Sequence, residues 1–149
     1  MSRNIKKTFR LLNLYPPYLG AGIRVTDYNE DVTRITVTMR QRWYNRNIFG
    51  THFGGSLYSM CDPFFVFILM QNLGKEYIIW DKTATIRFRK PGRGKVTAVF
   101  QIAPAKIEGI RAEMQTKEKA TFWFNAEVTN EAGEVVAEVE KEIYVRRKY

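Results

Sequence analysis

Asp62 is the residue whose type and surroundings most clearly allow chemistry. It lies within residues 54–73, which read GGSLYSMCDPFFVFILMQNL and are apolar on nearly every side. Such a segment predicts a buried helix of about 20 residues, about 30 Å long. A carboxylate costs free energy to bury unless it is paired or used in a reaction. Asp62 therefore marks a candidate site.

Gly54 and Gly55 stand at the start of the same segment. Gly54 lies eight residues before Asp62. The first N–H groups of a helix have no partner within it, and the helix dipole is positive there. The two glycines could present these groups to a ligand, or they could simply form a tight turn from loop to helix. Pro63 directly follows Asp62 and cannot bond to the Ser59 carbonyl, so it predicts a kink.

Alternating apolar and polar residues surround this helix on both sides in the sequence. An amphipathic helix is expected at residues 3–14, ended by the Pro16-Pro17 pair, and a loop with a helical turn at 104–119. The asparagine-to-glycine stretch 130–133 predicts a hairpin. Strands are expected in residues 22–43, as two strands joined by a polar turn at 27–31, and at 82–90, 95–102, 121–129 and 134–146.

A single apolar helix needs cover on all sides, and an antiparallel sheet of about five to six strands curling around it provides that cover. The sequence thus predicts one α+β domain over residues 1–149. Strand edges left open in one chain are commonly closed by a second copy, so a homodimer or a dimer of dimers is expected.

Composition narrows the class of partner. The net charge of +9 suits a polyanionic ligand or serves solubility alone, and the basic residues show no nucleic-acid-binding motif. No apolar stretch is long enough to span a membrane, and no signal peptide is evident. One cysteine, Cys61, cannot form an internal disulfide, and the single histidine leaves no metal-ligand spacing. We expect a cytoplasmic protein without a metal.

Residues 47–62, which read NIFGTHFGGSLYSMCD, resemble the N-x-x-G-T-x-H-G-G-x-L-x-x-x-x-D signature of hotdog-fold acyl-CoA thioesterases. Within that superfamily the sequence is most similar to the phenylacetate-pathway (PaaI-like) group. The strand ending in R-F-R-K-P, at residues 87–91, also resembles the strand that follows the family's helix. The resemblance covers residues 45–102 and implies a long central helix wrapped by the sheet, the hotdog fold.

The resemblance also implies residue roles. Asp62 becomes the general base or nucleophile at the thioester, and the Gly54 N–H becomes an oxyanion donor beside Gly55. Asn47 matches a family asparagine that could hold water or the carbonyl, although an Asx turn explains it equally well. Asp81 falls where some relatives position water with a serine, and it could equally be a solvated turn residue.

One feature departs from the family motif, and a second lies outside it. Phe53 occupies the position of the family histidine, and His52 stands one residue earlier, where its side chain points elsewhere. Basic residues near the next strand could bind the phosphates of coenzyme A or form a solvated strand face. These residues are Lys82, Arg87, Arg89, Lys90 and Arg93.

The function that follows is hydrolysis of an acyl-CoA to a carboxylic acid and free coenzyme A, with no cofactor beyond the coenzyme A of the substrate. A non-catalytic acyl-CoA or acyl-lipid binding module on the same fold is the alternative. A hotdog dehydratase is disfavoured because this helix lacks the histidine that such enzymes pair with their acid.

Overall fold

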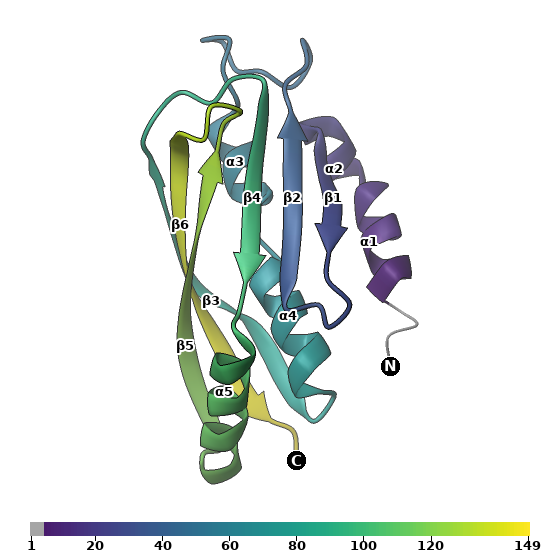
Figure 1. Ribbon diagram of the computed structural model, residues 1–149, viewed down its shortest axis with the longest axis vertical. Helices are drawn as coiled ribbons and strands as arrows, with labels where there is room; N and C mark the ends of the chain where they lie inside the picture. The colour runs from purple at the N-terminus through teal and green to yellow at the C-terminus, as the bar shows by residue number, and fades with distance from the viewer. Residues whose placement is uncertain (1–4) are drawn as a thin grey trace.

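Alternating residues form six antiparallel strands in the computed structural model, which describes residues 5–149. The strands make one sheet in the order β1-β2-β4-β5-β6-β3. Helices α3 (Gly54–Ser59) and α4 (Phe64–Leu73) lie against one face of this sheet (Figure 1). This is the α+β hotdog arrangement that the sequence predicts. The strands are β1 (Ile23–Tyr28), β2 (Arg34–Arg40), β3 (Tyr77–Phe88), β4 (Lys95–Gln101), β5 (Lys119–Thr129) and β6 (Val135–Arg147).

The apolar side chains of α4 form the centre of the core. Phe64 stacks on Phe100 of β4 with ring centroids 5.0 Å apart, and Phe65 stacks on Phe124 of β5 at 5.2 Å. All four rings are buried. Burying a side chain of this size stabilises the fold by about 1.5–3 kcal/mol. The expected burial of the central helix is confirmed.

The central helix is interrupted at Pro63, so α3 and α4 are separate segments. Pro63 has no N–H to donate to the Ser59 carbonyl. That carbonyl instead accepts hydrogen bonds from the Asp62 N–H at 3.3 Å and from the Tyr18 hydroxyl at 2.7 Å. The kink predicted from Pro63 is confirmed, and it places Asp62 in the gap between the two helices.

Two short helices precede the sheet. The predicted N-terminal helix is α1 (Ile5–Asn13); residues 3 and 4 of the prediction lie outside the described part. Pro16 then starts a second helix, α2 (Pro16–Ala21), because proline suits the first helical position. The Asn13 side chain accepts a hydrogen bond from the Val25 N–H (2.8 Å) and donates one to the Val25 carbonyl (3.1 Å). Asn13 therefore closes part of the free edge of β1.

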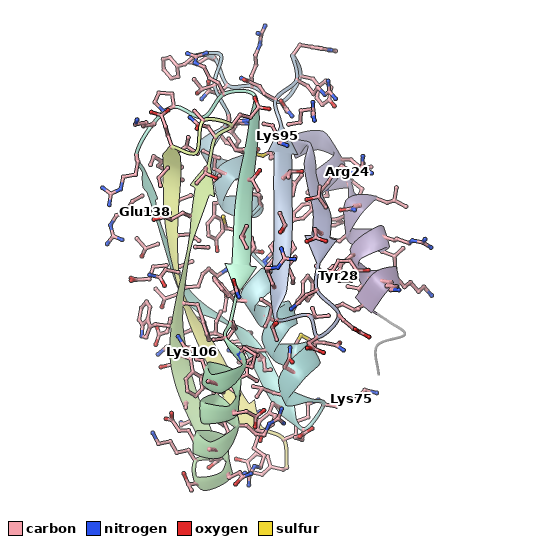
Figure 2. All side chains as sticks on the ribbon, viewed as in Figure 1. Arg24, Tyr28, Lys75, Lys95, Lys106 and Glu138 are labelled. Carbon is pink, nitrogen blue, oxygen red and sulfur yellow. The ribbon has the colours of Figure 1, made fainter. Side chains whose placement is uncertain are left out.

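The prediction of a loop with one helical turn at residues 104–119 is wrong. The structure has a 13-residue helix, α5 (Pro104–Thr116), with Pro104 in its first turn. Its buried residues Ile107, Ile110 and Met114 recur at helical spacing, but the charged residues between them obscure this pattern in the sequence. Figure 2 shows Lys106 of this helix in the lower half of the view.

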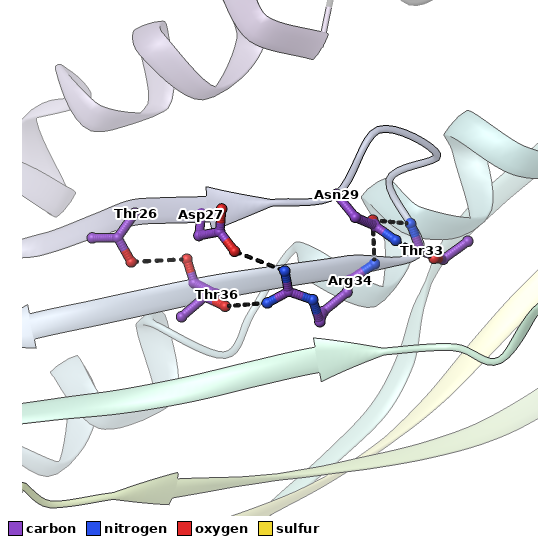
Figure 3. A network of polar contacts seen from close by, with 6 residues as sticks. All are labelled: Thr26, Asp27, Asn29, Thr33, Arg34 and Thr36. Atoms are coloured by element: carbon purple, nitrogen blue, oxygen red, sulfur yellow. Dashed lines mark hydrogen bonds and ion pairs between the residues drawn. The ribbon is translucent and has the colours of Figure 1, made fainter.

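A polar turn joins β1 to β2, as the sequence predicts (Figure 3). The Asn29 Oδ1 accepts hydrogen bonds from the N–H groups of Thr33 and Arg34, both at 2.9 Å. The Arg34 guanidinium pairs with the Asp27 carboxylate at 2.8 Å. The predicted hairpin between β5 and β6 is also present, where Gly133 adopts a φ of 79°.

β3 is longer than predicted, since it begins at Tyr77 rather than at residue 82. It pairs with β6 over almost its whole length, from Tyr77 opposite Arg147 to Phe88 opposite Ala137. Its other edge has no strand partner within residues 5–149. A long strand is therefore left open at one side of the sheet.

Candidate active site

A buried lysine on β6 fixes Asp62. The Lys141 ammonium donates a hydrogen bond to the Asp62 main-chain carbonyl at 2.6 Å and lies 3.4 Å from the Asp62 Oδ1. The Lys141 side chain is 0% exposed, whereas the Asp62 side chain is 53% exposed. One buried cation thus holds both the backbone and the carboxylate of Asp62, and leaves the carboxylate accessible.

Asp81 and Tyr58 complete this group. The Asp81 Oδ1, on β3, lies 2.9 Å from the Lys141 ammonium. The Tyr58 hydroxyl, on α3, donates a hydrogen bond to the Asp62 Oδ1 at 3.2 Å, and its ring centroid lies 5.5 Å from the Lys141 ammonium. We call Tyr58, Asp62, Asp81 and Lys141 the Asp62 cluster. The structure therefore brings two of the predicted residues, Asp62 and Asp81, to one cation.

Burial and charge set the protonation states in the cluster. Burial raises the pKa of Asp81, although the Lys141 hydrogen bond and charge oppose this shift. Burial lowers the pKa of Lys141, but the hydrogen bond and charge of Asp81, with the charges of Tyr58 and Asp62, outweigh it and raise the pKa overall. The pKa of Tyr58 is raised, mainly by burial. At neutral pH Lys141 is therefore positive and Tyr58 is a neutral donor.

Cys61 precedes Asp62 but does not fit a nucleophile. Its side chain is buried, and burial raises the pKa of the thiol to about 12. A thiol attacks as its thiolate, which is scarce at neutral pH under these conditions. Asp62 is therefore the candidate reactive group at this position.

A second group of predicted residues lines a cleft beside the start of α3. The cleft has a volume of about 500 Å³, within the range of small-molecule sites. Phe49, Leu57 and Phe88 form apolar parts of its wall. We call it the Gly54 cleft. The predicted residues in its lining are Asn47, His52, Gly54, Arg89, Lys90 and Arg93.

Gly54 and Gly55 begin α3, as predicted. In the described part of the chain neither N–H donates a hydrogen bond. A Cβ at Gly54 would lie 3.1 Å from the Phe88 ring, and one at Gly55 would lie 2.6 Å from the Phe53 ring. The two glycines thus let the rings of Phe53 and Phe88 pack against the first turn of α3, where the Gly54 and Gly55 N–H groups remain free to donate.

Asn47 organises the loop that carries the cleft. Its Oδ1 accepts hydrogen bonds from the N–H groups of Phe49 and Thr51, both at 3.0 Å. Its amide donates to the Thr51 hydroxyl at 2.9 Å and to the His52 carbonyl at 3.4 Å. Both sides of the amide are therefore engaged within the loop, which is the Asx-type alternative that the sequence left open.

His52 is turned into the protein. Its ring Nε2 lies 2.8 Å from the Gly94 carbonyl, which can only accept, so Nε2 carries the proton. Its Nδ1 is buried without a partner in the described residues. Burial lowers the pKa of His52, although the Gly94 contact opposes this shift. His52 is therefore a neutral ring that supports the wall of the cleft.

Most of the predicted basic residues are paired with the protein itself. Three of them form ion pairs with glutamates of the β5–β6 hairpin, and Arg93 donates a hydrogen bond to the Gly50 carbonyl at 2.9 Å. Arg87 lies opposite Glu138 in the β3–β6 register. The ion pairs are Lys82 with Glu142 (3.3 Å), Arg89 with Glu138 (2.7 Å) and Lys90 with Glu134 (2.6 Å).

The structure does not bring the Asp62 cluster and the Gly54 cleft together within one chain. Asp62 and Asp81 are not among the residues that line the cleft. Gly54 stands at the first residue of α3 and Asp62 lies beyond its last, and a six-residue helix is about 9 Å long. The predicted carboxylate and the predicted oxyanion donor therefore lie at opposite ends of one helix.

Sequence reasoning missed Lys141 and Tyr58. The signal for Lys141 is its register in β6, because it alternates with the buried residues Val139, Ile143 and Val145 on the inward face. A lysine on an apolar strand face needs a partner, and two carboxylates supply it. Tyr58 lies four residues before Asp62, the spacing of neighbours on a helix.

The six-stranded antiparallel sheet with its central helix is the hotdog fold. Several solved structures share the fold, although they are distant in sequence. A Pseudomonas aeruginosa protein of unknown function, described as a probable thioesterase, is 21% identical with a TM-score of 0.82, over 96% of this chain and 95% of that one. The E. coli PaaI protein, from the phenylacetic acid degradation operon, is 19% identical with a TM-score of 0.66, over 99% and 96%.

The chain belongs to the family described as "Domain of unknown function (DUF4442)", whose profile matches residues 5–145. A Haemophilus influenzae thioesterase is 14% identical, with a TM-score of 0.69 over 95% of this chain and 90% of that one. No curated protein matches the sequence. Within residues 5–149 no helix has both the length and the apolar character that crossing a membrane requires.

Proposed function

We propose that this protein is a cytoplasmic acyl-CoA thioesterase. The observation that carries the proposal is Asp62, a carboxylate exposed over about half of its surface in a break of the apolar central helix. A buried ammonium, Lys141, fixes it from behind. The exposed part of the carboxylate is open to a substrate. The thioesterase-like fold supports the same activity.

In the proposed reaction Asp62 acts as a general base. Its carboxylate takes a proton from water while the water oxygen attacks the thioester carbonyl carbon. The tetrahedral intermediate then collapses, the carbon–sulfur bond breaks, and the proton passes to the thiolate of coenzyme A. Tyr58 and Lys141 hold Asp62 in place, and Asp81 positions Lys141 through their ion pair.

The unused N–H of Gly54 is the proposed donor to the carbonyl oxygen as negative charge develops on it. Asn47 acts indirectly, because its amide holds the loop that leads into α3. The acyl chain enters along the apolar wall of the Gly54 cleft, beside Leu57 and Phe88.

The separation of Asp62 from Gly54 leads to a shared site. We propose that two copies meet across a two-fold axis, so that Asp62 of one chain faces Gly54 or Asn47 of its partner. In this arrangement the open edge of β3 pairs with its own copy. A homodimer is then the smallest active unit, and two such dimers can assemble further.

The test is hydrolysis of a panel of acyl-CoAs, followed with a thiol reagent, by the wild type and by Asp62→Asn. The substitution keeps the side-chain volume but removes the base, so we expect kcat to fall by about 10²–10⁴-fold. Acyl-CoA binding should change little. Asp31→Asn, at an exposed carboxylate in the β1–β2 turn, is the matched control and should retain full activity.

Two outcomes would overturn parts of this assignment. Equal activity of Asp62→Asn and the wild type would make Asp62 structural. A wild type that binds acyl-CoA but hydrolyses none of a broad panel would be a non-catalytic acyl-CoA binding module on the same fold.

A further inference from the structure

Four arginines line a cleft at the β1 edge of the sheet, which is the edge opposite β3. The cleft has a volume of about 940 Å³ and lies between the N-terminal helices and the strands β1 and β2. Its basic residues are Arg10, Arg24, Arg40 and Arg42, and none of them belongs to the Asp62 cluster or the Gly54 cleft. We call it the arginine cleft.

Backbone pairing gathers these residues. Arg24 of β1 lies opposite Thr38 of β2, and Arg40 stands two residues further along β2, so both arginines point to the same face of the sheet. Arg42 follows two residues later, just beyond the strand. Arg10 belongs to α1, which is held to β1 through the Asn13 hydrogen bonds. Helix α1, the strands β1 and β2 and the segment after β2 therefore contribute four arginines to the wall of one cleft.

The arginine cleft has no internal counter-charge. Its lining contains no aspartate or glutamate, and among residues 5–149 none of the four arginines forms an ion pair. Arg34, on the same strand as Arg40, is by contrast paired with Asp27 (Figure 3). Neighbouring cations without an anion repel one another, and a bound anion relieves that repulsion.

Apolar side chains complete the wall. Leu14, Leu19 and Tyr44 line the cleft and are more than half exposed, at 65%, 52% and 55%. Guanidinium groups match phosphate oxygens two at a time, and an aromatic face suits a flat ring attached to the phosphates. The hollow shape fits a small molecule better than a flat lipid surface, and its volume lies in the range of small-molecule sites.

We propose that the arginine cleft binds a small molecule that carries two or more phosphate groups. Two sources share this chemistry: the phosphorylated end of coenzyme A, and a separate phosphorylated metabolite. The proposal does not depend on hydrolysis, because it concerns a binding site with its own residues.

Titration calorimetry with adenosine 3′,5′-bisphosphate and with inorganic pyrophosphate tests it. The wild type should show saturable binding that weakens as salt is added. Arg24→Gln/Arg40→Gln should weaken this binding by more than tenfold, since each lost charged contact removes a strong hydrogen bond. Lys75→Gln/Lys119→Gln removes the same charge at two exposed lysines outside the cleft and should bind as the wild type does. Circular dichroism of both double variants verifies that they are folded.

Three results would refute the proposal: no saturable binding at low salt, equal weakening in both double variants, or binding only to vesicles of anionic lipid. The last result would make the cleft a membrane-docking face. The acyl-CoA assay then separates the two sources. A KM that rises tenfold in Arg24→Gln/Arg40→Gln at constant kcat identifies the phosphates as those of coenzyme A. An unchanged KM, with pyrophosphate binding lost, identifies a separate ligand.

Discussion

At the scale of single residues, the pairing of Lys141 with two carboxylates decides how much of the Asp62 carboxylate stays free. One ammonium serves two carboxylates, those of Asp62 and Asp81. Asp81 is the less exposed of the two, at 28% against 53%, and it lies closer to the ammonium, at 2.9 Å against 3.4 Å. Asp81 therefore makes the closer ion pair with the buried ammonium, and Asp62 keeps a more accessible and more weakly paired carboxylate.

Lys141→Met tests this balance, since it keeps the length of the side chain and removes the charge. Asp81 is then left partly buried without a partner, and we expect the free energy of unfolding to fall by about 2–3 kcal/mol. We also expect kcat to fall at least tenfold, because the contacts that hold the Asp62 carbonyl and carboxylate in place are lost. Urea unfolding and the kcat of acyl-CoA hydrolysis measure the two effects.

The control for Lys141→Met is the double variant Lys141→Met/Asp81→Asn. Removing the unpaired carboxylate should restore part of the lost stability, a coupling that a double-mutant cycle measures. If the loss in free energy of unfolding of the double variant equals the sum of the losses in Lys141→Met and Asp81→Asn, the ion pair does not stabilise the fold. An unchanged kcat in Lys141→Met would remove Lys141 from the proposed mechanism.

His52 predicts a pH dependence of stability. Burial lowers its pKa from the ordinary value of 6.5, so below about pH 6.5 the unfolded chain binds a proton more readily than the folded protein. The stability that neutral His52 contributes is present above that pH and is lost as the pH falls. We expect the free energy of unfolding to drop between pH 7 and pH 5 by more in the wild type than in His52→Gln, whose amide can still donate to the Gly94 carbonyl. Parallel curves would contradict this assignment.

Asp62 and Pro63 stand out in the sequence because both break a local rule: a charge and a proline inside an apolar helix. Lys141 breaks a rule too, but its partner is 79 residues away in the chain. The order of the sheet, which places β3 next to β6, decides that Lys141 meets Asp81. No local pattern carries that information.

At the scale of elements, the strands follow from the alternation of apolar and polar residues and the central helix from its long apolar run, but α5 follows from neither. The burial of Ile107, Ile110 and Met114 supports α5 through tertiary packing, and the Arg111 guanidinium donates to the Asn72 carbonyl at the end of α4 at 2.6 Å. A helix stabilised by such contacts shows little amphipathic pattern of its own. The N-terminus of α3 is likewise shaped by Phe88, a residue of β3 that sequence proximity does not reveal.

The break between α3 and α4 gives an element-scale prediction. Pro63→Ala restores an N–H that can bond to the Ser59 carbonyl and so favours a continuous helix. The Asp62 carbonyl would then turn away from Lys141. We expect kcat to fall at least tenfold while the free energy of unfolding changes by less than about 1 kcal/mol.

Pro104→Ala is the matched control, because Pro104 also stands at the start of a helix but lies beside Gln71 and Asn72, at the other end of α4 from Asp62. It should change stability by a similar amount and leave kcat as in the wild type. If Pro63→Ala keeps full activity, the break is not needed to present Asp62. A crystal structure of Pro63→Ala that retains the Lys141–Asp62 contact would support the same conclusion.

At the scale of the whole molecule, the two edges of the sheet differ. The edge at β1 is partly closed, because the Asn13 side chain pairs with the backbone of Val25. The edge at β3 is a 12-residue strand that pairs with β6 on one side and has no strand on its other side in the described chain; it carries the exposed aromatic residues Trp80 and Phe88. An open strand of this length invites pairing with another copy. The same edge lies beside both halves of the proposed site, since Asp81 and Phe88 both belong to β3.

Assembly through β3 is therefore the prediction for the whole molecule. Sedimentation should give twice the chain mass of 17.5 kDa, or a multiple of that dimer, at micromolar concentration. Thr85→Lys adds a charge near the middle of the open strand, opposite Glu140 of β6, and should shift the protein toward the monomer. Activity should fall with the dimer fraction, because Asp62 and Gly54 of one chain stand at opposite ends of α3. Val99→Lys adds the same charge on the exposed face of β4 and should leave both mass and activity unchanged. A fully active monomer would show that one chain holds a complete site.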